Sequence, residues 1–170
     1  MVKYNAAVRR IPASSLAWAA LLAAVVGWAA LLVSAPLLGQ GTAGGVGPAV
    51  AASVYFSGAL VCHHRTERSF HLAGAQLPVC GRCTGLYLFA AAGVLLALSW
   101  RWGRPTGGPR NSTPYRSWLL AAALPSLLTL ALEWSGASPV SNAARAAAAA
   151  PLGLVLGGLL VEAAGFRGRL

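Results

Sequence analysis

The stretch CHHRTERSFHLAGAQLPVCGRCTG, residues 62–85, interrupts an otherwise apolar chain and determines how that chain is divided. It contains all three cysteines and all three histidines of the protein, together with one of its three acidic residues, Glu67. The sequence on either side consists mostly of Ala, Leu, Val and Gly. Because polar side chains are concentrated in this one stretch, we expect the functional site to lie within it.

The composition of the whole chain indicates a membrane protein. Of its 170 residues, 57% are hydrophobic and 9% are charged, whereas an ordinary soluble domain has about 25% charged residues. The mean hydropathy is +0.65. The net charge of +10 is compatible with nucleic-acid binding, but the basic residues lie in short clusters at the ends of apolar runs, as cytoplasmic flanks do. We therefore predict an integral membrane protein whose partner is the lipid bilayer, not nucleic acid.

The apolar runs predict an all-α membrane protein that forms one domain over residues 1–170. Residues 48–61 form a short apolar segment, which is more typical of a re-entrant or interfacial helix than of a spanning one. Gly153 and Gly157 have the spacing of a close helix–helix contact, although in so Gly- and Ala-rich a chain composition alone explains this spacing equally well. Four runs are long enough to cross a bilayer: residues 16–38, 84–100, 117–133 and 143–161.

The distribution of positive charge decides between four and five crossings. If residues 48–61 span the membrane, six basic residues lie on each side, with Arg145 at the start of the last helix left out of the count, and this gives no clear bias. If they do not span, nine basic residues in the two tails and the 101–116 loop lie opposite four. The second arrangement obeys the positive-inside rule. It predicts a multi-pass protein of the plasma membrane with both termini in the cytoplasm and the polar stretch 62–83 at the outer face.

The predicted helices are antiparallel, and this brings further polar residues to the same face. The helix over residues 117–133 ends at Glu133, and the last helix begins near Asn142 and Arg145. A carboxylate and a guanidinium at this depth are costly unless they pair or serve a site. Both a structural ion pair and a role beside the site are compatible with this pattern.

The cysteines and histidines have the chemistry of a transition-metal site, and zinc is the expected ion. Cys80 and Cys83 form a C-x-x-C unit, and Cys62 and His63 complete a tetrahedral set of sulfur and nitrogen ligands. His64, His71 or water are alternatives for the fourth position, since neighbouring residues ligate one ion awkwardly. A c-type haem is excluded because Thr84, not His, follows Cys83.

Two other interpretations of the cysteines stay open. Cys80 and Cys83 also suit a membrane thiol–disulfide oxidoreductase coupled to quinone, with Arg82 lowering the thiol pKa. A structural disulfide with one spare thiol is the third interpretation. A non-catalytic assembly or metal-handling protein would need no reaction at all.

If the metal site is catalytic, the arginines and Glu133 have predicted roles. The ion would act on an amphiphilic or anionic substrate such as a lipid, and Arg68 and Arg82 would hold its anionic group. Glu133 would act as a general base or orient the ligands. Three further polar residues are expected around the site: Ser69, Asn142 and Arg145.

Several of these residues resemble the signature of a known family. The pattern Cys-His, Arg-Ser-Phe and Cys-x-Arg-Cys-x-Gly-x-Tyr, formed here by Cys62-His63, residues 68–70 and residues 80–87, is similar to that of small prokaryotic membrane proteins called domain of unknown function 2085. The resemblance covers about residues 55–157 and includes the later Ser141-Asn142 and Arg145. Gln usually follows Cys-His in the family, where this chain has His64. The resemblance implies a membrane protein with this Cys/His motif and no particular activity.

Overall fold

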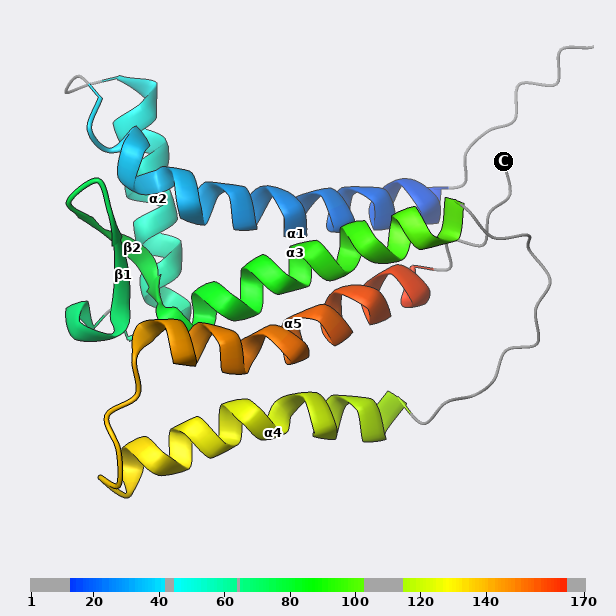
Figure 1. Cartoon of the computed structure of the whole chain (residues 1–170). Helices are drawn as coiled ribbons and strands as arrows, with labels where there is room; N and C mark the ends of the chain where they lie inside the picture. Colours follow the sequence, from blue (N-terminus) through cyan, green and yellow to red (C-terminus); the bar gives the residue numbers. More distant parts are fainter. Residues whose placement is uncertain (1–12, 42–44, 64, 103–114, 165–170) are drawn as a thin grey trace, which may run out of the picture.

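The computed structural model describes residues 13–41, 45–63, 65–102 and 115–164 (Figure 1). Within these ranges the chain forms five α-helices, a short 3-10 helix and a β-hairpin. The elements follow one another as α1 (Ala13–Leu38), α2 (Val46–Val61), η1 (Thr66–Arg68), β1 (Ser69–Leu72), β2 (Ala75–Cys80), α3 (Gly81–Trp102), α4 (Tyr115–Trp134) and α5 (Asn142–Ala163).

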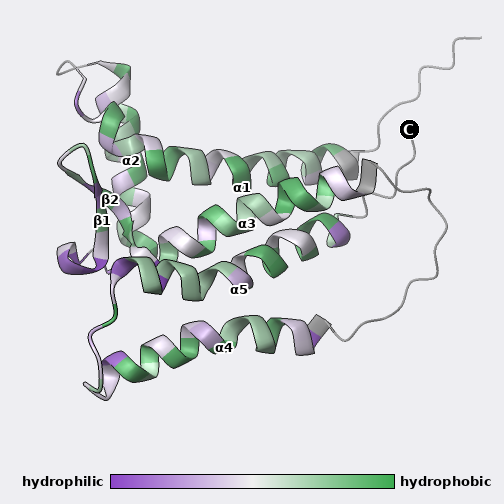
Figure 2. Cartoon of the chain, viewed as in Figure 1, coloured by the Kyte–Doolittle hydropathy of each residue, from purple (hydrophilic) through white to green (hydrophobic). Residues whose placement is uncertain are grey.

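Four of the helices are long and apolar enough to cross a membrane, which confirms the predicted fold class. Helix α2 is shorter than these four. Figure 2 shows the hydrophilic residues gathered mainly around η1, β1, the end of α4 and the start of α5. The four candidate spans are Leu16–Leu38, Gly81–Trp100, Arg116–Trp134 and Asn142–Ala163.

Helix α2 lies across one end of the bundle, while the four long helices run alongside one another (Figure 1). It packs against α1 and β2. Its contact with β2 is close, since a Cβ added at Gly58 would lie 2.4 Å from the carbonyl oxygen of Pro78. A crosswise helix at the bundle end fits the interfacial alternative for this segment.

The polar stretch contains a β-hairpin that the sequence analysis did not predict. Strands β1 and β2 are antiparallel, and Leu72 pairs with Ala75 across a two-residue turn. Both turn residues have positive φ, 51° at Ala73 and 80° at Gly74. Turns of this kind favour Asn or Asp before Gly, and Pro within a strand is unusual. Ala73 and Pro78 therefore conceal the hairpin in the sequence. Helix α3 also begins at Gly81, about one turn before the predicted residue 84.

Helices α3 and α5 pack closely through glycines on both helices. A Cβ added at Gly157 would lie 2.1 Å from the Ala90 carbonyl oxygen, and one added at Gly85 would lie 2.2 Å from that of Ala146. A Cβ added at Gly153 would likewise lie 2.5 Å from the Leu86 carbonyl oxygen. The spacing of Gly153 and Gly157 is therefore a true packing feature, because only glycine lets two helix backbones approach so closely.

Candidate metal centre

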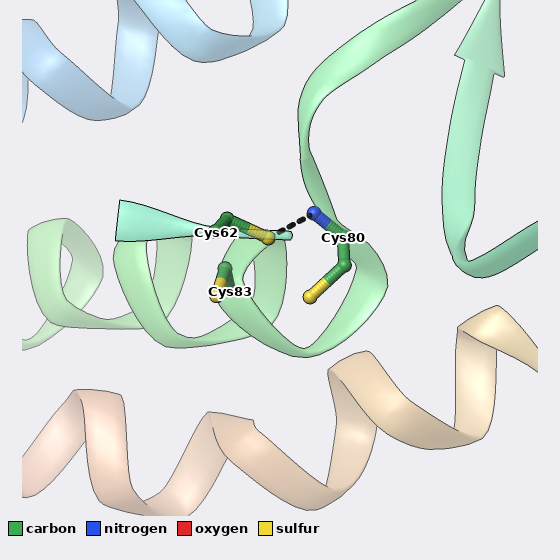
Figure 3. A group of neighbouring side chains, drawn as sticks. All are labelled: Cys62, Cys80 and Cys83. Atoms are coloured by element: carbon green, nitrogen blue, oxygen red, sulfur yellow. Dashed lines mark hydrogen bonds between the residues drawn. The ribbon is translucent and has the colours of Figure 1, made fainter. Parts of the chain in front are cut away.

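The three cysteines come together at the end of the bundle where α2, the hairpin and α3 meet. Their Sγ atoms all lie within 4.8 Å of one another, as Figure 3 illustrates. Each comes from a different element: Cys62 follows the last residue of α2, Cys80 ends β2, and Cys83 lies in the first turn of α3. The crosswise course of α2 therefore places Cys62 beside the C-x-x-C unit.

Hydrogen bonds that each involve at least one backbone group hold the cysteines in this arrangement. The Cys80 N–H donates to the Sγ of Cys62 over 3.2 Å, and the Cys62 N–H donates to the Gly58 carbonyl over 2.9 Å. The Thr84 hydroxyl donates to the Cys80 carbonyl over 3.0 Å. Strand, turn and helix thus restrict the positions of the sulfur atoms before any ligand binds.

The surroundings of the thiols are apolar. Cys62 is buried in a cluster with Leu32, Ala35, Val54 and Val79, and Cys80 and Cys83 pack against the same cluster. An uncompensated thiolate in such surroundings is costly, because burial disfavours charge. A bound cation would supply the compensation, as it does in metal–thiolate sites.

Cys80 has the electrostatic character of a metal ligand or a nucleophile. A hydrogen bond with the Cys83 side chain lowers the pKa of the Cys80 thiol, although burial acts in the opposite direction. Further hydrogen bonds from the backbone of Cys83, the Cys62 side chain and the backbone of Arg82 also lower this pKa. The thiolate is the form that binds metals and attacks disulfides.

The histidines do not join this group of sulfur atoms in the described part of the chain. His63 is exposed although it adjoins Cys62, and His71 is exposed on β1. Neither contributes to the set of donor atoms within 4.8 Å. His64 lies outside the described residues.

Glu133 forms two ion pairs next to the cysteine group. Its Oε2 accepts from Arg82 Nη2 over 3.3 Å, and its Oε1 accepts from Arg145 Nε. The Glu133 side chain is only 5% exposed. The structure therefore brings Glu133 and Arg145 together, as the antiparallel arrangement predicted, and adds Arg82 to the pair.

Hydrogen bonds extend this network to the hairpin and to the start of α5. Asn142 accepts from Arg145 Nη1 over 2.6 Å and donates to the Ser69 carbonyl over 2.9 Å. The Ser141 hydroxyl accepts from the Ala144 N–H over 3.1 Å, and this N-cap sets where α5 begins. The predicted neighbours Ser69, Asn142 and Arg145 are thus linked in one chain of contacts.

One member of the network, Thr129, was not predicted from the sequence, and one predicted residue, Arg68, lies outside it. Thr129 accepts a hydrogen bond from Arg82 Nη2 over 3.2 Å, and its position four residues before Glu133 on α4 is the signal that identifies it. Arg68 is half-buried in η1. No hydrogen bond or ion pair links its side chain to another described residue.

Comparison with known proteins supports the membrane assignment. A family model described as "Predicted membrane protein (DUF2085)" matches residues 62–159, which include the cysteines and the Glu133 network. An uncharacterized protein of Methanothermobacter thermautotrophicus is 42% identical over 22% of this chain and 48% of its own length. The chain thus spans about half the length of this curated relative. No solved structure matches.

Proposed function

This chain belongs to the DUF2085 family of predicted membrane proteins, and we propose that its function depends on a transition-metal ion bound at the outer membrane face. The ligands in this proposal are Cys62, Cys80 and Cys83, with zinc as the expected ion. The convergence of three thiols from three elements within 4.8 Å is the observation that supports it. A structural disulfide would need only two of them.

The fourth coordination position is proposed to be open to water or substrate. The sequence predicted His63 there, but its side chain is exposed and outside the group of donor atoms. Catalytic zinc sites keep such an open position, whereas structural sites are closed by four protein ligands. An open position would let the ion polarise a carbonyl or phosphoryl group of an amphiphilic substrate.

Glu133 is better suited to a structural role than to that of a general base. Both of its carboxylate oxygens accept hydrogen bonds from arginines, and the side chain is almost entirely buried. A general base needs access to the proton that it removes. We therefore assign Glu133 to holding the ends of α3, α4 and α5 together.

Metal analysis of the purified protein tests the proposal. We expect about one metal ion per chain in the wild type and in His63→Ala, and less than about 0.3 in Cys62→Ser, Cys80→Ser and Cys83→Ser, because removing one thiolate ligand greatly weakens a zinc site. Wild-type protein with less than about 0.3 metal per chain would overturn the proposal. Loss of metal in His63→Ala would instead make His63 the fourth ligand.

Thiol–disulfide exchange is the second candidate, favoured by the lowered pKa of Cys80 at the start of a helix. It predicts metal-free protein in which Cys80 and Cys83 cycle between thiol and disulfide. Counting free thiols before and after a mild reductant distinguishes the two candidates. A count that does not change eliminates exchange.

We further propose that both termini face the cytoplasm and that α2 lies at the outer face of the plasma membrane. Positive charge supports this orientation, and the exposed Phe56 and Leu60 of α2 give that helix an apolar surface for lipid. In a background with the native cysteines replaced by serine, Ala73→Cys is expected to react with an impermeant reagent in intact cells, while Thr106→Cys is protected. Strong labelling of Thr106→Cys would show that this loop faces outward and that the proposed orientation is wrong.

A further inference from the structure

The buried charges at the cysteine end of the bundle do not balance. Arg82 and Arg145 have side chains 24% and 12% exposed, and both pair with the single carboxylate of Glu133. The chain has only three acidic residues. Glu67 pairs with Arg65 at the surface over 3.9 Å, and Glu162 lies about 25 Å away along α5, at 1.5 Å per residue. No carboxylate side chain is left to neutralise the second arginine.

The two arginines also lie where a positive charge is unfavourable. Arg82 is in the first turn of α3 and Arg145 in the first turn of α5, and the start of a helix carries a positive partial charge. The two helix starts touch, because a Cβ at Gly81 would lie 2.8 Å from the carbonyl oxygen of Asn142. Two adjacent helix starts with two guanidinium groups form a strongly positive region, which favours an anion.

Donor capacity is left over in this region. Arg82 uses Nη2 for both Glu133 and Thr129, and its buried Nε has no hydrogen-bond partner among the described residues. Arg145 uses Nε and Nη1. The cysteines do not take up the surplus. Arg82 bonds to Cys80 through its backbone, and its guanidinium donates to Thr129 and Glu133 rather than to a thiol.

We propose that Arg82, Arg145 and the adjoining starts of α3 and α5 bind a phosphate group, supplied either by an anionic lipid headgroup or by inorganic phosphate. Guanidinium groups match the oxygens of phosphate with paired hydrogen bonds. The region lies at an end of the spanning helices, where headgroups are found. We include Arg68 in the proposed site as a third guanidinium, because the carbonyl of the next residue, Ser69, accepts from Asn142 and so brings the Arg68 backbone near this region. None of these residues is a proposed metal ligand, although Arg82 lies between Cys80 and Cys83 in the chain.

Thermal unfolding of the full-length protein in detergent tests the proposal. Inorganic phosphate and dihexanoyl phosphatidylglycerol are each titrated, with sodium chloride at equal ionic strength as the control. A rise in Tm with both probes identifies the phosphate group as the ligand, and a rise with only one identifies its source. If neither probe raises Tm above the chloride control, the proposal is wrong.

Variants locate the binding. Arg82→Lys keeps the charge but loses the paired geometry, and it is expected to weaken the binding of the active probe about tenfold. Arg68→Gln serves as a second variant. The Arg68 side chain contacts no described residue through a hydrogen bond or ion pair, so its replacement is not expected to unfold the protein. Arg116→Lys is the matched control. Arg116 lies on the exposed first turn of α4, at the other end of that helix from Glu133. Unchanged binding in both Arg82→Lys and Arg68→Gln overturns the site, and metal content measured in parallel is expected to stay constant.

Discussion

Replacing Glu133 with glutamine is expected to destabilise the folded protein by about 3–5 kcal/mol, the usual result of removing one partner from a buried ion pair. The substitution preserves the shape of the side chain and removes only its charge. Arg82 and Arg145 then face each other without an anion between them. Their repulsion is screened little, because both guanidinium groups are largely removed from water.

The matched control is Glu67→Gln, which removes the same charge from the surface. Glu67 and Arg65 are 67% and 62% exposed and lie 3.9 Å apart, so the loss is expected to be below about 1 kcal/mol. Unfolding by denaturant in mixed lipid–detergent micelles measures both variants. Equal stability of Glu133→Gln and the wild type would contradict a structural role for the network.

Replacing Gly157 with alanine is expected to separate α3 from α5 and to destabilise the protein by at least about 1–3 kcal/mol, the usual cost of overpacking. The added methyl group would lie 2.1 Å from the carbonyl oxygen of Ala90 and 2.8 Å from the amide nitrogen of Val94. Both obstacles are backbone atoms of α3, so no side-chain rotation relieves the clash. The helices themselves have to move apart.

The neighbouring Gly158 provides the control for this prediction. A Cβ at Gly158 meets nothing within 4 Å, so Gly158→Ala is expected to be neutral or stabilising by up to about 1 kcal/mol through helix propensity. The two variants have the same composition and differ only in the face of α5 that they change. Equal melting temperatures for the two would show that α3 and α5 do not pack through Gly157.

The sequence alone predicted the membrane fold and the stretch that contains the candidate metal centre. Length and hydropathy of each run are local properties, and they predict the four long helices because a spanning segment must satisfy its own backbone hydrogen bonds. The short length of residues 48–61 likewise predicted a helix that differs from the other four. Antiparallel connection then placed Glu133 and Arg145 at the same end, since the helices that carry them are neighbours in the chain.

Only the tertiary structure decided which side chains meet. The hairpin is hidden in the sequence because Ala73 occupies a positive-φ position that usually favours Asn or Asp, and the closeness of Cys62 to Cys80 depends on the crosswise packing of α2 against β2. The role of Gly157 depends on the backbone of α3, which lies more than sixty residues earlier in the chain. The contacts of the Arg82 guanidinium with Glu133 and Thr129 on α4 likewise appear only in the folded chain. Contacts between residues far apart in sequence follow from the packing of whole helices, and local residue patterns do not encode that packing.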